Sequence, residues 1–406
     1  MQFLLANVLA ALVLIASGAP NKLLTVQKYA GTKVVGSYIV HLKADADKDA
    51  LFAADPVLAE SVTHPDWTII NAFAGRFSTE TLNKLRASDL VDSILEDGVV
   101  SINDKLEHIS DDGGSVSIEA TQTDAPWGLH RLSSTSAVNG DQTLLNYTYT
   151  YSDSYQGQGV DVYIVDTGIN LAHVDFGGRA KNGYVGTGLN STDDNGHGSN
   201  VASVAGGTRW GVAKQVSLIS VKVLDSSGSG TLANVVGGFN YVGTAAAASG
   251  RPSLASASLG GSASTSIDSA VTALTSAGIP VVVAAGNSNV DAGTTSPARV
   301  TSAFTVGAID ITDTKASFSN YGSVVDIWAP GVYIPGAYYT STTALAAYSG
   351  TSQATPHISG LVAIYLSEFG KTAPNTIIAN LWSRTGILKS IPSGTVNRLG
   401  VGPVTV

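Results

Sequence analysis

Continuous apolar runs recur from about residue 120 onward and alternate with stretches typical of helices. The runs cover residues 160–165, 218–224, 254–259, 279–283 and 304–309, and the helical stretches between them include residues 231–248 and 266–277. Strands that are apolar throughout, rather than at every second position, are typical of a parallel sheet buried on both faces. The pattern therefore predicts an open α/β fold with a mostly parallel sheet and helices on both faces.

The first hundred residues have a different pattern. Residues 36–42 and 91–100 are short apolar segments typical of strands, and residues 79–87 form an amphipathic pattern that Thr79 or Thr81 could cap. These elements predict a small α+β domain before the larger one. Residues 103–119 are polar, with Asp111-Asp112-Gly113-Gly114 at their centre, which predicts an exposed linker.

The chain begins with an apolar run over residues 3–15, broken only by Asn7 and followed by four small residues, Ala16 to Ala19. Such a run is too short to span a bilayer and indicates a secretory signal cut near Gly18 or Ala19. The alternative is an N-terminal anchor, which the small residues disfavour. We therefore expect a secreted, extracellular protein with four segments: a signal (1–19), a small domain (20–102), a linker trimmed on maturation (103–119) and a large domain (120–406).

Composition narrows the function classes. The chain has 406 residues, 44% apolar and 13% charged, and no cysteine, so it has neither disulfides nor a thiolate metal site nor a cysteine nucleophile. Residues 20–119 carry 9 basic and 16 acidic side chains, whereas residues 120–406 carry 13 and 15. The larger part is therefore nearly neutral, which argues against nucleic acid and membrane surfaces as partners and favours neutral polymers or peptides.

Three polar clusters follow predicted strands or open predicted helices, the places where parallel α/β sheets carry their functional groups. They are Val165-Asp166-Thr167-Gly168, Asn195-Gly196-His197-Gly198-Ser199, and the run from Ser349 to His357 that contains Ser352. The third cluster opens an apolar helix that we expect to end near Phe369.

Together these clusters contain the groups of a nucleophilic serine site. A serine hydroxyl is a weak nucleophile until a histidine accepts its proton, and a buried carboxylate orients that histidine and stabilises its cation. Ser352 at a helix start also offers its backbone N–H to an oxyanion, and Asn287, after the strand at 279–283, is a candidate second donor. Each residue alone is more often a cap, a turn or a structural hydrogen bonder. Their joint occurrence in the order Asp, His, Ser, which is the order of subtilisin, favours catalysis.

The chain resembles the subtilisin-like serine peptidases, and within them the proteinase K-type branch. The resemblance covers most of residues 120–400 and rests on eight stretches: 165–168, 195–198, 211–214, 221–225, 258–261, 284–287, 318–322 and 350–352. It implies that Asp166, His197 and Ser352 are the catalytic triad and that Asn287 is the oxyanion amide. It also implies that the acidic segment before the large domain is a propeptide that acts as inhibitor and intramolecular chaperone. This part of the resemblance rests on matches at residues 38–40 and 96–100.

The resemblance further implies how substrate binds. A peptide would lie as an extended strand between Gly228-Ser229-Gly230 and Ser258-Leu259-Gly260, and Ala284, Ala285 and Gly286 would line a primary pocket with room for a large apolar or aromatic residue. We expect broad specificity, protein and peptide substrates, a monomer, and no catalytic cofactor.

One structural calcium position of the family matches this sequence, with Asp326 as the carboxylate and the carbonyls of Thr301 and Ala303 as further ligands. At a second usual calcium position the carboxylate is replaced by Ile387, so we expect this second site to be lost.

The sequence departs from the family at several positions. Ser199 and Asn200 replace the usual threonine and histidine after the catalytic histidine, and Gln353 replaces the usual methionine after the nucleophile. His357 matches the family motif, and we expect it to be structural. The family's usual maturation junction falls near Asn103, whereas the match to the mature start resumes only at Ala120.

Two other functions compete with an endopeptidase. A non-catalytic binding protein on the same fold would be expected to lack at least one of the four catalytic residues, and all four are present. A lipase or esterase would need a Gly-x-Ser-x-Gly elbow and the order Ser, Asp, His, neither of which occurs. Asn146-Tyr147-Thr148 and Asn190-Ser191-Thr192 are candidate glycosylation sites.

Overall fold

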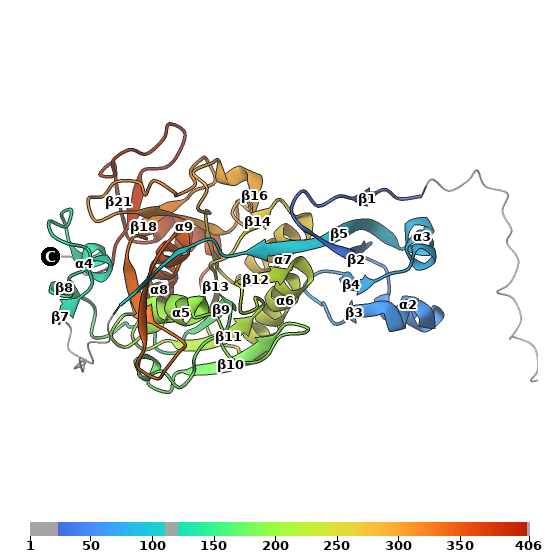
Figure 1. The fold of residues 1–406 in the computed structure, drawn as a ribbon, viewed down its shortest axis with the longest axis horizontal. Coiled ribbons are helices and arrows are strands. Elements are labelled where there is room, and N and C mark those ends of the chain that lie inside the picture. Colours follow the sequence, from blue (N-terminus) through green and yellow to red (C-terminus); the bar gives the residue numbers. More distant parts are fainter. Residues whose placement is uncertain (1–22, 110–120, 404–406) are drawn as a thin grey trace, which may run out of the picture.

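The computed structural model describes residues 23–109 and 121–403, and the predicted signal lies outside this range. Figure 1 shows a small domain at one end of the molecule and a larger α/β domain at the other. A long strand, β5, runs from the first into the second.

The small domain is a sheet in the order β1-β5-β2-β4-β3 with three short helices. All its strand pairs are antiparallel except β1 with β5. The helix predicted at 79–87 is confirmed, but Ser78 caps it rather than Thr79 or Thr81, because Ser78 Oγ accepts the N–H of Thr81 at 3.1 Å. The elements are β1 (Val26–Gln27), β2 (Lys33–Leu42), α1 (Lys48–Ala54), α2 (Pro56–Ser61), β3 (Val62–His64), β4 (Ala72–Arg76), α3 (Thr79–Ala87) and β5 (Val91–Ser101).

The large domain contains the predicted sheet, a nine-stranded one in the order β10-β11-β9-β13-β15-β17-β18-β22-β21. Every neighbouring pair is parallel except β21 with β22. The five predicted strands are all present, with ends shifted by no more than two residues. The strands are β9 (Asp161–Asp166), β10 (Ala180–Val185), β11 (Ser217–Lys222), β13 (Ser253–Ala257), β15 (Val281–Ala284), β17 (Phe304–Ile309), β18 (Ile327–Pro330), β21 (Ser383–Thr385) and β22 (Arg398–Gly400).

Helices cover both faces of this sheet, as the largely apolar strands predicted. Along β9, Val162 and Ile164 belong to one core with side chains of α5 and α8, whereas Tyr163 and Val165 belong to another with side chains of α6 and α7. Successive residues of a strand point to opposite faces, so each needs an apolar partner layer. The four helices are α5 (His197–Gly206), α6 (Leu232–Ser249), α7 (Thr265–Ser276) and α8 (Thr351–Phe369).

Shorter elements complete the large domain and connect it to the small one. They are β6 (Lys105–His108), β7 (Thr121–Ala125), α4 (Trp127–Ser133), β8 (Tyr147–Thr150), η1 (Val174–Phe176), β12 (Ser229–Thr231), β14 (Gly261–Ser262), η2 (Ala292–Thr294), β16 (Thr295–Ser296), β19 (Ile334–Ala337), β20 (Leu345–Ser349) and α9 (Pro374–Asn380).

The small domain lies against α6 and α7 (Figure 1). Side chains of both domains share one apolar core, and polar contacts add to it. The side-chain oxygen of Asn240 accepts the backbone N–H groups of Thr68 and Ile69 at 2.6 and 3.0 Å. His64 Nε2 lies 3.0 Å from Asn234 Oδ1, and Asp97 accepts the N–H of Ala233 at the start of α6. A carboxylate at a helix N-terminus satisfies amides that have no partner within the helix, so this contact helps to fix the two domains together.

Residues 105–108 of the predicted exposed linker form a strand rather than an irregular loop, although Lys105 and Leu106 are exposed as predicted. These residues form β6, which pairs with β20 in a three-stranded sheet β19-β20-β6. The polar composition suggested a loop, but β20 has an edge left unpaired by β19, and the backbone of any sequence can satisfy such an edge. The remainder of the predicted linker, residues 110–119, lies outside the described residues.

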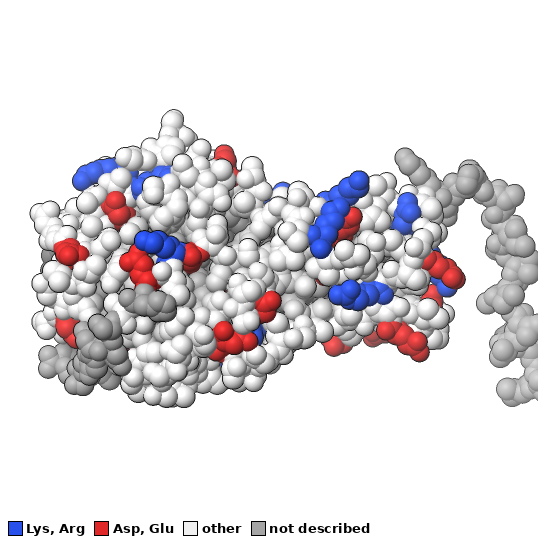
Figure 2. Space-filling view, in the orientation of Figure 1, with Lys and Arg blue, Asp and Glu red and all other residues white. Residues whose placement is uncertain are grey.

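No helix among the described residues is long and apolar enough to cross a membrane. On the face shown in Figure 2, basic and acidic side chains are scattered and form no continuous basic area. This distribution agrees with the near-neutral balance of the large domain.

Candidate active site

Asp166 and His197 come from the end of β9 and the first residue of α5. Asp166 Oδ1 lies 2.8 Å from His197 Nδ1, and both side chains are fully buried. Gly196 before the helix has a φ of 104°, and a Cβ there would clash with the ring of Tyr338, so a glycine is needed for this approach. Burial alone would lower the pKa of His197, but Asp166 and Asp104 together raise it to about 10.

Ser352 lies in the first turn of α8, which runs to Phe369 as expected and ends at Gly370. Its hydroxyl donates to Asp104 Oδ1 at 3.0 Å and approaches the carbonyl of Ser258 at 3.3 Å. Pro356 removes the N–H that would bond the Ser352 carbonyl within the helix, and the hydroxyl of Ser258 donates to that carbonyl instead, at 2.8 Å.

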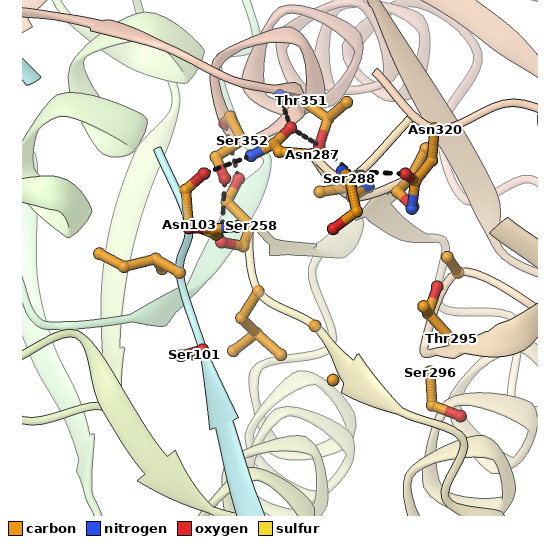
Figure 3. A pocket seen from close by; sticks show the side chains of 18 of the residues that line it. Ser101, Asn103, Ser258, Asn287, Ser288, Thr295, Ser296, Asn320, Thr351 and Ser352 are labelled. Carbon is orange, nitrogen blue, oxygen red and sulfur yellow. Dashed lines mark hydrogen bonds between the residues drawn. The ribbon is translucent and has the colours of Figure 1, made fainter. Parts of the chain in front are cut away.

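Asn287 follows β15 and is held by the start of α8. Its Oδ1 accepts both the N–H and the hydroxyl of Thr351 at 2.8 Å. Its Nδ2 donates to the carbonyl of Asn103 at 3.1 Å (Figure 3). The same Nδ2 also donates to Asp104 Oδ1 at 2.6 Å. Thr351 therefore orients the amide of Asn287, the predicted oxyanion donor. The sequence did not point to this role of Thr351.

The end of β5 occupies the place predicted for a substrate strand. Ser101 exchanges backbone hydrogen bonds with Gly260 at 3.2 and 3.4 Å, and the N–H of Ile102 donates to the carbonyl of Gly228 at 3.0 Å. On the other side, β12 pairs with β5 in antiparallel register, Ser229 opposite Ser101 and Gly230 opposite Val100. The chain's own residues 99–102 thus lie between the two predicted flanking segments.

A cavity of about 570 Å³ opens beside this strand. Ala284, Ala285 and Gly286, the predicted pocket residues, line it. Asn103 and Ser352 line it as well (Figure 3). The remaining lining residues are Ser101, Ile102, Ser258, Leu259, Gly260, Gly261, Ser262, Asn287, Ser288, Thr294, Thr295, Ser296, Ala298, Asn320 and Thr351. The small side chains leave space next to Asn103 that a larger side chain could fill.

Asp104 lies at the centre of these contacts, and it was not predicted from the sequence. One carboxylate oxygen lies 2.8 Å from His197 Nε2, and the other accepts from Ser352 Oγ and from Asn287 Nδ2. Three of the four candidate catalytic residues, His197, Ser352 and Asn287, therefore meet on a carboxylate of the chain itself. Its place, one residue after the family's usual maturation junction, was the available signal.

Asp193 was also missed, and it positions α5. One of its oxygens accepts from the N–H and hydroxyl of Ser199 at 3.0 and 2.5 Å, and the other accepts the hydroxyl of Thr167 at 2.9 Å. Asn200, which replaces the family's histidine, donates to the carbonyl of Ala346 in β20. These contacts connect the start of α5 to its surroundings without entering the reacting centre.

His357 lies in the interior of the fold, away from these contacts. Its Nδ1 lies 2.7 Å from the carbonyl of Gln353, and burial lowers its pKa to about 4. A neutral, hydrogen-bonded histidine agrees with the structural role expected for it.

The candidate calcium position is centred on Asp326, just before β18. Its Oδ2 accepts the N–H of Thr305 at 2.9 Å, two residues after Ala303. Burial raises the pKa of Asp326 to about 6, against the effects of the Thr305 amide and of Arg398. A cation bound at this position would favour the ionised form of this carboxylate. Among the described residues no three His, Cys, Asp or Glu side chains cluster as metal ligands, so such a site would depend on carbonyls such as those of Thr301 and Ala303.

Comparison with known proteins agrees with this geometry. Residues 157–402 match the model of the subtilase family of peptidases. A cuticle-degrading protease of Metarhizium anisopliae is 40% identical over 98% of this chain and 97% of its own length, and the alkaline serine protease ver112 of Corniculantispora psalliotae is 39% identical over 92% and 91%. An alkaline serine exoprotease A of Vibrio alginolyticus is 43% identical over 81% of this chain, which spans 58% of that relative.

Among solved structures, a cold-adapted subtilisin-like serine proteinase aligns with a TM-score of 0.62 and 40% identity, covering 68% of this chain and 97% of the other. The family model spans more than half of the chain, and the sequence identity with these relatives extends over most of the chain. The chain therefore belongs to the subtilase family of serine peptidases.

Proposed function

We propose that the protein is a secreted endopeptidase that hydrolyses peptide bonds in proteins through Asp166, His197 and Ser352, with Asn287 as oxyanion donor. The observation that carries this proposal is the meeting of His197, Ser352 and Asn287 on the carboxylate of Asp104, with Asp166 2.8 Å behind the histidine. Groups that converge on one anion within the fold can converge on the anion that forms during acyl transfer.

In the proposed mechanism, Ser352 Oγ attacks the carbonyl carbon while His197 Nε2 accepts the hydroxyl proton. The carbonyl oxygen becomes an oxyanion that Asn287 Nδ2 and the backbone N–H of Ser352 stabilise. His197 then gives the proton to the leaving amine, which departs as the C–N bond breaks. Water, deprotonated by His197, hydrolyses the acyl enzyme and restores Ser352. Asp166 holds the imidazole and stabilises its cation throughout.

We infer that residues 20–102 act as an inhibitory propeptide and that the Asn103–Asp104 bond is the first one cut. The support is that Asn103 directs its carbonyl at Asn287 Nδ2 while residues 99–102 lie in the substrate position. The cavity next to Asn103 favours substrates with a larger, apolar or aromatic residue before the cut. Residues 99–102 pair through their backbone on both sides. A substrate bound in the same way would be recognised largely without regard to its side chains, which favours broad specificity.

The decisive experiment compares Ser352→Ala with the wild type. We expect the variant to lose peptide hydrolysis, labelling by a fluorophosphonate and clearing of casein, and to keep its propeptide. Ser323→Ala, at an exposed position outside the site, is the matched control and should behave as wild type. Hydrolysis by purified Ser352→Ala at the wild-type rate would overturn the assignment. N-terminal sequencing of the secreted wild type would locate the maturation cut.

The alternative is a non-catalytic binding protein on the same fold. It predicts no fluorophosphonate labelling of the wild type and a precursor that keeps its full length. All four candidate catalytic residues are present, which favours an enzyme over a non-catalytic binding protein; they are Asp166, His197, Asn287 and Ser352.

A further inference from the structure

The strand β20 has an edge that the chain's own residues 105–108 cover. β6 pairs with it in antiparallel register, with Lys105 opposite Ser349 and His108 opposite Ala346, while the other edge of β20 pairs with β19. Because Asn103 directs its carbonyl at Asn287, Lys105 is the second residue after the bond presented to Ser352, and His108 is the fifth. The pairing therefore follows the chain well beyond the reacting centre, over ~13 Å of strand.

An apolar pocket lies where this pairing ends. It has a volume of about 240 Å³, and Ile109, the sixth residue after the presented bond, lines it. Leu345, next to the last paired residue of β20, belongs to the same pocket, so pairing and pocket are continuous. The other lining residues come from separate segments of the fold and are Thr143, Leu144, Leu145, Trp210, Tyr333 and Pro335.

We propose that, once residues 104–109 have left, the edge of β20 and this apolar pocket together bind the part of a protein substrate that follows the scissile bond. We call this surface the leaving-side groove, defined by Leu345–Ser349 and the pocket residues Leu144, Leu145, Trp210, Tyr333 and Pro335. Its occupant is an extended polypeptide with an apolar side chain at the sixth position after the cut. The inference rests on the proposed peptidase function and extends it to the substrate's length and sequence.

The exposure of residues 105–109 indicates at which positions the groove would select for particular side chains. Leu106 is 37% exposed, and Lys105 and Glu107 pair with each other at 2.8 Å near the surface. The middle positions therefore contribute backbone pairing and tolerate different side chains. Ile109 is half-buried in the pocket, whose wall includes the buried ring of Trp210. Selectivity is thus expected at the sixth position and little at the second to fourth.

The test uses the secreted mature enzyme, with its N-terminus sequenced to show that residues 104–109 are gone. Three peptides share the same sequence through the third residue after the cut: one ends there, one continues to the seventh with Ile at the sixth position, and one has Ser at that position. We expect kcat/KM for the Ile peptide to exceed that for both others by about three- to tenfold, because the open pocket buries only part of the side chain.

Leu144→Ser changes a pocket residue that is 45% exposed and should remove most of this gain while leaving the short peptide unaffected. Ile387→Ser, at a 38% exposed residue outside the pocket lining, is the matched control and should keep the gain. Equal kcat/KM for the three peptides, or an equal loss on all three in Leu144→Ser, would overturn the leaving-side groove. Failure of the wild type to cleave even the short peptide would instead overturn the peptidase function, and the groove with it.

Discussion

The carboxylate of Asp104 lies 2.8 Å from Nε2 of His197, the atom that would accept the proton of Ser352 in the proposed mechanism. Ser352 itself donates its hydroxyl to the other oxygen of the same carboxylate. A histidine held between two carboxylates, Asp166 and Asp104, carries its proton and cannot act as a base. Under the proposed function, this arrangement presents the chain's own peptide bond to a triad whose histidine is held in its protonated, inactive form.

We therefore expect Asp104→Asn to process itself faster than the wild-type precursor. Asparagine keeps the size of the side chain but removes the negative charge that stabilises the His197 cation, and the loss of one charge-assisted hydrogen bond of ~1.4 kcal/mol would correspond to about tenfold. The measurement is the rate of disappearance of the full-length precursor after refolding. Glu107→Gln, an acid-to-amide change three residues away, is the control. Processing at an unchanged or lower rate in Asp104→Asn would contradict the inhibitory role.

The charge state of His197 gives a pH prediction. Its pKa in the precursor is raised to about 10, above the ordinary value near 6.5, so its contribution to stability is fully present below pH 6.5 and is lost as the pH rises through 10. In a Ser352→Ala precursor, which cannot cut itself, unfolding by denaturant should become easier between these pH values. Adding Asp104→Asn should weaken that dependence. An imidazole NMR signal of His197 that titrates near pH 6.5 in the precursor would disprove the prediction.

Much of the large domain could be predicted from its sequence because its strands are buried on both faces. A strand such as β17, Phe304–Ile309, is buried at every position and apolar at all but Thr305, and this pattern marks both its ends. The helix α8 likewise ends at a glycine, Gly370, with a φ of 71°. The small domain offered weaker signals, and Ser78 was overlooked as a cap because the neighbouring threonines have the same chemistry.

The candidate site was predictable for residues whose roles depend on their own neighbours in sequence. Asp166, His197, Ser352 and Asn287 each lie at or after the end of a strand or open a helix. The structure brings the last three onto the carboxylate of Asp104 and places Asp166 behind His197. Asp104 could not be predicted in this way, because its partners are 93 to 248 residues distant in the sequence. The strand β6 could not be predicted either, because it forms by pairing with an edge of β20 that is similarly far along the chain. Composition described that segment as polar, which is true of a loop and of an exposed strand alike.

Removal of the side-chain amide of Asn287 should slow catalysis without preventing folding. We expect Asn287→Ala to lose about 10²–10³-fold in kcat, a magnitude carried over from the equivalent change in subtilisin rather than obtained from this chain. KM should change little, because the donor acts on the developing oxyanion more than on the bound peptide. Steady-state kinetics on the short peptide would test this, with circular dichroism to verify the fold. A kcat equal to the wild-type value would remove Asn287 from the site.

Gln353, next to the nucleophile, leads to a prediction about oxidation. Methionine at this position would become a bulky polar sulfoxide under peroxide, and glutamine does not undergo that reaction. The sequence holds one methionine, Met1, in the predicted signal. The mature enzyme should therefore keep its activity in peroxide, whereas Gln353→Met should be inactivated several times faster. Similar rapid inactivation of both proteins, with oxygen addition detected elsewhere by mass spectrometry, would contradict this.

Asp326 is the basis of the calcium prediction. Burial raises the pKa of its carboxyl to about 6, and a calcium ion held by this carboxylate and nearby carbonyls would compensate the buried charge. A ligand that binds the folded state alone stabilises it by roughly 2.7 kcal/mol at a hundredfold excess over its dissociation constant. Chelation should therefore lower the melting temperature and speed autolysis, while activity measured at once at low temperature persists.

Asp326→Asn should reproduce the lower melting temperature and abolish its dependence on calcium. The experiment is a thermal melt of each protein in chelator and in millimolar calcium, with Asp310→Asn, at a carboxylate that bonds the amide of Thr312 in an exposed turn, as the control. The alternative is that Asp326 serves only to accept the N–H of Thr305 at the start of the β17–β18 pairing. In that case Asp326→Asn would lower the melting temperature equally with and without calcium, and the wild-type protein would melt at the same temperature in both buffers.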